Sequence, residues 1–87
     1  MTRISILMSV MNGERDVRTA IESLLTQTYR DFELLVVDDA SADQTPLILR
    51  QLSESDSRIR ILTNQMNLGL TRSLNRALHE AQGVYIA

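Results

Sequence analysis

The chain has 87 residues and a formal net charge of −2, and its nine basic residues are all arginine. The lack of lysine and cysteine excludes catalytic lysines, disulfides, thiolate metal sites and cysteine nucleophiles. The acidic balance argues against a nucleic-acid partner. Hydrophobic residues make up 44% of the chain and aromatic residues 3%, so the core must be aliphatic. The cytoplasm is the expected compartment, because the first residues lack the long apolar stretch of a signal peptide or membrane span.

The first half of the chain alternates between strand and helix patterns. Residues 4–8 form an apolar strand pattern, and Asn12-Gly13 follows as a turn. Apolar residues recur at helical spacing between residues 14 and 27, which predicts the first helix. Residues 33–37 are predicted as the second strand. Four consecutive apolar residues at its end are typical of a central strand that helices cover on both sides.

The second half repeats this alternation. Residues 47–52 are predicted as the second helix, because residues able to cap a helix precede them, and the polar stretch 53–57 is predicted as a loop. Residues 58–62 alternate as a third strand near an edge, and its two arginines are expected to face water. A helical stripe between residues 70 and 81 ends at Gly83, and residues 84–87 open a fourth strand.

The order of elements is therefore βαβαβαβ. Alternating strands and helices of these lengths predict an α/β fold of Rossmann-like type, with a parallel sheet and right-handed crossovers. The fourth strand has only just begun where the sequence stops. We therefore expect residues 1–87 to be an incomplete domain, the first part of a larger one.

Two adjacent carboxylates, Asp38 and Asp39, come directly after the second strand. A charge cannot remain inside an apolar layer, so both must emerge where the strand ends, at the edge where open α/β sheets bind ligands. Three interpretations follow: hydrogen bonds to an N–H-bearing ligand such as a nucleobase, ligation of a divalent metal, or capping of the next loop. The strand-end position favours a binding role over the cap.

The end of the first strand would neighbour this acidic pair if the first two strands are adjacent in the sheet. Ser9 and the exposed backbone around it are then candidates to hold a nucleotide. Neither the GxGxxG fingerprint of dinucleotide-binding folds nor a Walker motif is present. A phosphorylation receiver domain is excluded, because its acidic pair follows the first strand and its chemistry requires a lysine.

Four sequence blocks together resemble the inverting glycosyltransferases of family 2, which have the GT-A fold. The blocks are the first strand and its turn, an "SiL.QTy"-like segment over 20–29, a "fEiivVDDgStDgT"-like segment over 32–45, and a last block from Asn67 to the end of the chain. The resemblance covers essentially the whole chain. It implies a fragment of an enzyme that transfers a sugar from a nucleoside-diphosphate sugar, usually a UDP-sugar, to a saccharide or lipid-linked acceptor.

The resemblance also implies roles for individual residues. Asp39 matches the acid that contacts the nucleotide base, usually uracil, which leaves Asp38 as an organiser of the loop. Ser9 lies at the nucleotide edge, and the loop 67–69 approaches the nucleotide. Met11 stands where an aromatic side chain often stacks on the base, and its polarizable sulfur covers a base face less selectively. The predicted nucleotide-binding residues are Ser9, Met11, Asp38, Asp39, Asn67 and Gly69.

The catalytic parts of the family pattern are expected beyond this chain. In such enzymes an Asp-x-Asp motif after the fourth strand binds a divalent metal, manganese or magnesium, and a general base acts on the acceptor. We therefore assign no metal ligand and no catalytic residue here, and expect the full-length enzyme in the cytoplasm, peripheral at the inner face of the membrane. The alternative function is a non-catalytic α/β module that forms a homodimer through an exposed sheet edge.

Overall fold

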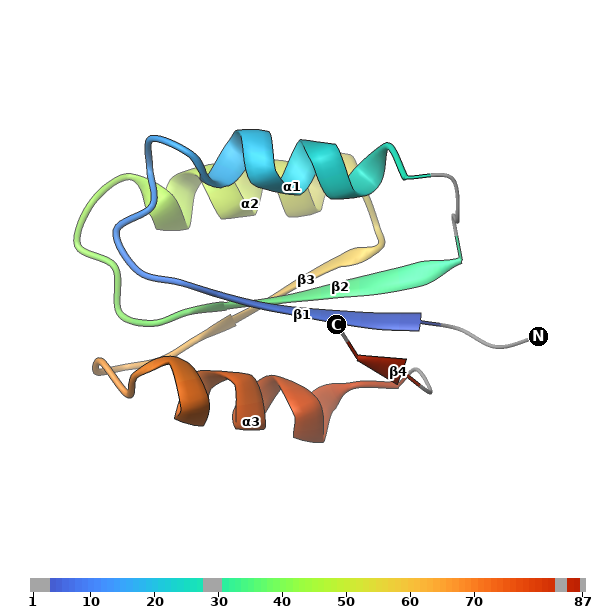
Figure 1. The fold of residues 1–87 in the computed structure, drawn as a ribbon. Helices are drawn as coiled ribbons and strands as arrows, with labels where there is room; N and C mark the ends of the chain where they lie inside the picture. The colour runs from blue at the N-terminus through green and yellow to red at the C-terminus, as the bar shows by residue number, and fades with distance from the viewer. Residues whose placement is uncertain (1–3, 28–30, 83–84, 87) are drawn as a thin grey trace.

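Strands and helices alternate along the chain in the computed structural model, which describes residues 4–27 and 31–82 and the backbone of residues 85–86 (Figure 1). This order confirms the predicted βαβαβαβ pattern and the α/β class. The strands are β1 (Ile4–Val10), β2 (Phe32–Asp38), β3 (Ile59–Thr63) and β4 (Tyr85–Ile86), and the helices are α1 (Val17–Leu25), α2 (Thr45–Ser55) and α3 (Leu70–Glu80).

Neighbouring strands of the sheet are parallel and lie in the order β3-β2-β1-β4. β1 pairs with β2 over its whole length, from Ile4 beside Phe32 to Val10 beside Asp38. This continuous pairing explains why β1 extends to Val10 rather than ending at Met8 as predicted. β3 lies at the edge of the described sheet, as its alternating pattern predicts.

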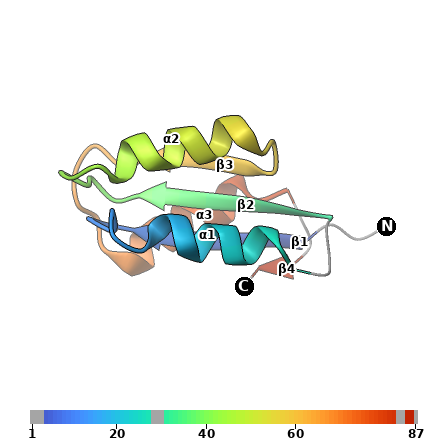
Figure 2. The same cartoon turned by 90° about the horizontal axis from the view of Figure 1, so that it is seen from above.

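Helices cover both faces of the sheet. α1 and α2 lie side by side on one face and α3 lies on the other, as Figure 1 and Figure 2 show from two directions. β2 is buried at every residue. Leu34 and Val36 pack in the core beneath α1 and α2, whereas Leu35 and Val37 pack with Ala77 of α3. Burial of each such side chain contributes about 1.5–3 kcal/mol, so this strand anchors the fold and fixes where its end emerges.

The bounds of α1 and α2 differ from the prediction, most at the end of α2 and at the start of α1. The sequence predicts a loop over 53–57, whereas α2 continues to Ser55. The hydroxyls of Ser53 and Ser55 donate to backbone carbonyls three residues earlier, at 2.9 and 2.8 Å, so these polar residues satisfy the helix end instead of breaking it. α1 begins only at Val17, because residues 14–16 form a turn.

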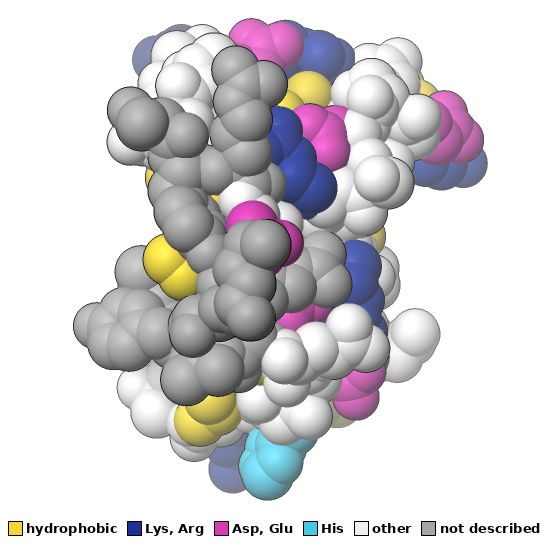
Figure 3. Space-filling model, turned by 90° about the vertical axis from the view of Figure 1, so that its right-hand side faces the viewer, with side chains coloured by type: hydrophobic (Ala, Val, Ile, Leu, Met, Phe, Trp, Pro, Cys, Tyr) yellow, Lys and Arg dark blue, Asp and Glu magenta, His cyan; other side chains and the backbone are white. Residues whose placement is uncertain are grey.

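The prediction that Arg58, just before β3, and Arg60, within it, face water is wrong. The Arg58 guanidinium carbon lies 4.5 Å from the centroid of the Phe32 ring, and the same side chain pairs with Asp56 at 2.7 Å. Arg60 pairs with the buried acid Glu33 at 3.2 Å. These pairs lie at the amino-terminal ends of the strands, the end of the molecule seen in Figure 3, where basic and acidic side chains lie beside one another.

Some predicted features fall outside the described residues. They are Thr28 and Tyr29 of the "SiL.QTy"-like segment, Gly83 as the end of α3, and Val84 and Ala87 of the fourth strand. Within the described part of the chain, no helix has the length and apolar character needed to cross a membrane.

Candidate functional site

The carboxyl ends of β1, β2 and β3 meet at one edge of the sheet. Two backbone hydrogen bonds hold these ends together. The Asp39 N–H donates to the Val10 carbonyl at 2.8 Å, and the Asn64 N–H donates to the Asp38 carbonyl at 2.9 Å. The first residues after each of the three strands are therefore neighbours, at the edge where open α/β sheets bind ligands.

Asp39 is the centre of this edge, and three donors hold its carboxylate. Oδ1 accepts hydrogen bonds from the Leu68 N–H at 2.7 Å and from the Asn64 side-chain amide at 2.9 Å, and Oδ2 accepts one from the Gly69 N–H at 2.9 Å. These bonds, that of the Leu68 N–H foremost, lower the pKa of Asp39 against the opposing effect of burial. The group is therefore an anion at neutral pH and can only accept hydrogen bonds.

The loop between β3 and α3 closes over Asp39 and reaches the loop after β1. Gly69 has a φ of 88°, in the left-handed region that favours glycine, and this turn aims the N–H groups of Leu68 and Gly69 at the carboxylate. The Asn67 side-chain amide contacts the sulfur of Met11. Met11 as a residue is 49% exposed. The structure thus brings Met11, Asp39, Asn67 and Gly69 together at one edge.

Hydrogen bonds also join the loop after β1 to the loop after β2. The Asn12 N–H donates to the Ser41 hydroxyl at 2.9 Å, and the Asn12 side-chain oxygen accepts from the Ala42 N–H at 2.8 Å. The Asp43 side chain accepts from the Thr45 N–H at 2.8 Å. The frame beside the site is therefore held by bonds between side chains and backbone rather than by regular secondary structure.

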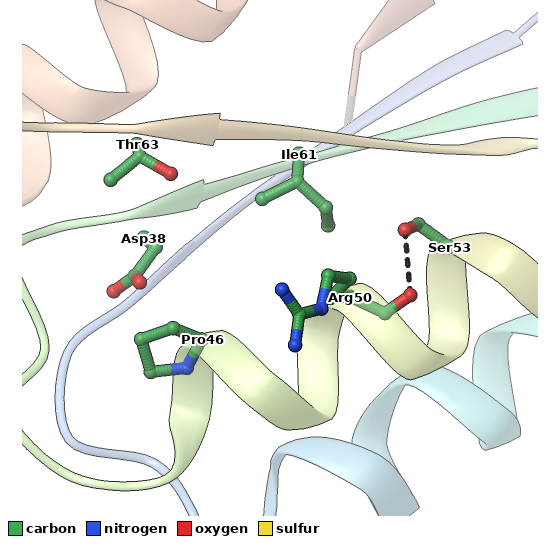
Figure 4. A pocket seen from close by; sticks show the side chains of 6 residues that line it. All are labelled: Asp38, Pro46, Arg50, Ser53, Ile61 and Thr63. Atoms are coloured by element: carbon green, nitrogen blue, oxygen red, sulfur yellow. Dashed lines mark hydrogen bonds between the residues drawn. The ribbon is translucent and has the colours of Figure 1, made fainter.

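Asp38, the last residue of β2, faces away from Asp39, which follows the strand and bonds to Asn64 and to the loop before α3. Its Oδ1 accepts from the Ser41 N–H at 3.1 Å, which agrees with the interpretation of Asp38 as an organiser of the loop. The structure does not place Asp38 with Met11, Asp39, Asn67 and Gly69. Instead Asp38 borders a cleft of about 290 Å³ between α2 and β3, shown in Figure 4. The lining residues are Asp38, Pro46, Arg50, Ser53, Ile61 and Thr63.

Ser9 lies beside Val37 in the sheet, one residue before the end of β1. Within the described residues, its hydroxyl forms no hydrogen bond to Asp39 or to any other residue. The residue borders a second, mostly apolar cleft of about 240 Å³ next to α1. Ser9 therefore lies at the same end of the sheet as Asp39 but does not take part in the hydrogen bonds around the Asp39 carboxylate.

The sequence analysis does not predict three residues that lie behind Asp39 and form a hydrogen-bonded chain with it: Asn64, Ser73 and Arg76. Asn64 offers one signal, since it follows β3 at the same strand-end position that singles out the acidic pair. Ser73 fits the apolar stripe of α3, which indicates burial. The sequence holds no signal for Arg76, because its contact joins two separate elements.

The residues around the edge do not form a metal site by themselves. Among the described residues, no group of three or more His, Cys, Asp or Glu side chains is close enough to hold a metal ion. The two adjacent acids turn to opposite sides of β2, and internal N–H donors occupy Asp39. Divalent cations such as Mg²⁺ need several convergent oxygen ligands, which this donor set does not supply.

Residues 5–87 match the model of Glycosyl transferase family 2. The chain belongs to this family. It is 44% identical over 84 residues to the UDP-Glc:alpha-D-GlcNAc-diphosphoundecaprenol beta-1,3-glucosyltransferase WfgD of Escherichia coli, a match that covers 97% of this chain and 32% of WfgD. This family 2 chain thus spans about a third of the length of that relative.

Two solved structures share the fold of this family 2 chain. The mannosyltransferase PcManGT from Pyrobaculum calidifontis, in complex with GDP-Man and Mn²⁺, matches with a TM-score of 0.87 and 26% identity, over 94% of this chain and 25% of PcManGT. S. aureus TarS 1-349 in complex with UDP-GlcNAc matches with a TM-score of 0.87 and 28% identity, over 99% of this chain and 25% of TarS. These matches confirm the GT-A type of α/β fold.

Proposed function

We propose that this chain is the nucleotide-binding part of a family 2 glycosyltransferase and that it holds the base of a nucleoside-diphosphate sugar at the Asp39 edge. The observation that carries the proposal is the anionic carboxylate fixed at the end of the central strand, with Met11 and the loop 67–69 beside it. That position in an open α/β sheet serves ligands. The likeness to proteins solved with UDP-GlcNAc and GDP-Man supports the same assignment.

The free hydrogen-bonding capacity of Asp39 favours uracil as the base. A carboxylate has about four lone-pair positions. Three internal N–H donors occupy both positions on Oδ1 and one on Oδ2, and the Ser73 side chain also lowers the pKa of Asp39. The remaining position matches the single N3–H that uracil presents between its two carbonyl groups. Guanine presents an N1–H beside an amino group and needs two adjacent acceptors, so the donor is proposed to be a UDP-sugar.

Met11 is proposed to cover one face of the base. A thioether in contact with an aromatic ring contributes about 0.3–1.5 kcal/mol, so Met11 provides affinity with little discrimination between bases. Asn67 contacts the Met11 sulfur and holds the side chain toward the loop. Gly69 and Ser9 are proposed to line the nucleotide from the α3 and β1 sides, and discrimination between bases then depends on Asp39.

The rest of the chemistry is proposed to lie outside residues 1–87, in the part of the relatives that this chain does not match. PcManGT is solved with Mn²⁺, whereas the described residues here supply no metal-ligand set. We therefore assign the divalent metal (Mn²⁺ or Mg²⁺), the general base and the acceptor site to a longer protein. The name of WfgD includes alpha-D-GlcNAc-diphosphoundecaprenol. A saccharide or lipid-linked acceptor is proposed here too, with the enzyme cytoplasmic and peripheral at the inner face of the membrane.

Calorimetric titration of the 87-residue chain with UDP, dTDP, GDP and ADP, with Mn²⁺ present, tests the assignment. We expect UDP and dTDP to bind more tightly than GDP or ADP, because uracil and thymine share the single N3–H. Asp39→Asn should weaken UDP binding about tenfold or more, since it removes a hydrogen bond to a charged acceptor. Glu22→Gln, which changes an exposed acid on α1, is the matched control.

Two results would contradict the proposal: no binding of any nucleoside diphosphate, or equal UDP affinity in Asp39→Asn and Glu22→Gln. Light scattering adds a third check on the same samples. A tight dimer that does not respond to nucleotides would support the interaction module instead.

A further inference from the structure

Asn64 lies directly behind the Asp39 carboxylate. It is the first residue after β3, it is 4% exposed, and its N–H bond to the Asp38 carbonyl fixes its position against β2. The side-chain nitrogen Nδ2 donates to Asp39 Oδ1 and to the Ser73 hydroxyl, both at 2.9 Å. The side-chain oxygen accepts from Arg76 at 2.7 Å. Both amide hydrogens and the amide oxygen are therefore engaged.

Two charged neighbours decide which way this amide points. A guanidinium carries only donors and a carboxylate only acceptors. If the amide of Asn64 turned by half a rotation, its NH₂ group would meet the Arg76 guanidinium and its oxygen would meet the Asp39 carboxylate, and both contacts would become repulsive. Arg76 thus fixes the amide, and the amide in turn gives Asp39 an N–H rather than an oxygen.

Helix α3 supplies both anchors of Asn64. Ser73 is fully buried against the sheet. Arg76 also donates to the Thr63 carbonyl at 2.7 Å, which ties its guanidinium to the end of β3. A row of hydrogen bonds that runs from a cation through an amide to an anion polarises each member. This row fills the second lone-pair position of Asp39 Oδ1 and leaves only the Oδ2 side for a ligand.

We infer that Asn64 is a positioning residue for the Asp39 carboxylate, held in its working orientation by Ser73 and Arg76 of α3. Through Asn64, α3 sets the direction from which Asp39 accepts the N–H of the base. The inference rests on the proposed nucleotide site, because it assigns a direction to the residue that binds there. It predicts that Asn64 affects base recognition without touching the nucleotide.

The electrostatic surroundings make this arrangement measurable. The Asn64 amide is the second-largest cause, after the Leu68 N–H, of the lowered pKa of Asp39. The packed elements carry further charged or titratable groups: Arg72, Arg76, His79 and Glu80 on α3, Arg60 on β3, and Glu33 and Asp38 on β2. Glu33 lies at the opposite end of β2, the Asp38 carboxylate points to the other face, and β1 carries no titratable side chain. Loss of the Asn64 donor should therefore raise the pKa of Asp39 toward the ordinary aspartate value of about 3.9.

Two readouts on the 87-residue chain test the inference: the pKa of Asp39 from the carboxyl ¹³C shift without nucleotide, and the affinity for UDP. In Asn64→Ala and in Arg76→Gln we expect the pKa of Asp39 to rise and UDP affinity to fall, about tenfold for Asn64→Ala. Arg76→Lys keeps the charge and should restore part of both. Arg18→Gln is the control, since Arg18 is an exposed arginine that bonds a side chain of another helix, Gln51, at 2.8 Å.

The outcomes separate this inference from the proposed function. An unchanged pKa of Asp39 in Asn64→Ala and Arg76→Gln overturns the positioning role, whatever the nucleotide does. If Asn64→Ala fails to fold, the exposed Arg76 still gives the answer through Arg76→Gln and Arg76→Lys. A raised pKa together with no UDP binding by the unmodified chain keeps the positioning role and overturns the nucleotide site. If the pKa of Asp39 rises but UDP affinity is unchanged, the link between the positioning of Asp39 and nucleotide binding is overturned.

Discussion

Replacement of Glu33 by alanine should destabilise the fold strongly while leaving the nucleotide edge intact. Glu33 is 1% exposed and lies on β2 at the end of the sheet opposite Asp39. Its carboxylate accepts from the Ser5 hydroxyl and the Gln82 N–H, each at 2.5 Å, and from Arg60 at 3.2 Å. One buried acid thus links β1, β2, β3 and the residues after α3.

The magnitude follows from these partners. The two short hydrogen bonds to the charged acceptor contribute about 1.5–3 kcal/mol each. Arg60 adds less, because its side chain is partly exposed and water replaces the lost ion pair. The loss should therefore be about 3–5 kcal/mol, the range for breaking a buried pair. That is a large share of the roughly 4–13 kcal/mol expected for a chain of this length. Glu33→Gln should cost less, because its amide oxygen still accepts one bond.

Urea unfolding followed by circular dichroism measures this loss, with Glu22→Ala on the exposed face of α1 as the control at less than about 0.5 kcal/mol. A change below about 1 kcal/mol in Glu33→Ala would refute the reasoning, since buried donors would then have lost their charged acceptor at no cost. Weaker UDP binding per folded molecule would refute the claim that the two ends of the sheet act independently.

Further predictions concern the core, one turn and pH. Leu35→Ala, at a side chain with no exposed surface, should lower the free energy of unfolding by about 2–5 kcal/mol in the same urea assay. Gly13→Ala should cost about 1–3 kcal/mol, because the new Cβ would lie 2.6 Å from Val10 Cγ2; an unchanged midpoint would show that the turn relaxes freely. The pKa values of Asp39 and Asp56 are lowered, by the Leu68 N–H bond and the Arg58 side chain respectively, so their stabilisation is complete above the unfolded value of about 3.9. Melting temperature should accordingly stay level from neutral pH to about 5 and fall as pH drops below about 4, and a fall already at pH 6 would contradict this assignment.

The sequence predicts the sheet well because burial is a local signal. The apolar run of β2 indicates cover on both faces, and the structure places helices on both. The alternation of β3 indicates an edge, which is where that strand lies. The end of α2 is predicted less well, because the hydroxyls of Ser53 and Ser55 bond to the helix backbone instead of ending it. Polar composition alone does not distinguish these outcomes.

The partners of charged side chains are what sequence patterns leave out. A two-residue period assigns Arg60 to a strand face, but it does not reveal that Glu33, 27 residues earlier, lies within reach. Asp39 is identified by its position at a strand end, whereas its donors come from 25 to 30 residues further along the chain. These contacts depend on how the loop before α3 folds back over β2. Only the assembled sheet brings them together.

The most direct test of the central claim is a titration of the ¹⁵N-labelled chain with UDP, followed by amide NMR shifts. If the Asp39 edge binds the base, the amides of Leu68 and Gly69 should shift most, because both N–H groups bond the carboxylate that receives the ligand. The amides at the opposite end of the sheet, around Glu33, should stay in place. Shifts confined to the cleft beside Asp38 and Arg50, or no shifts at all, would contradict the account.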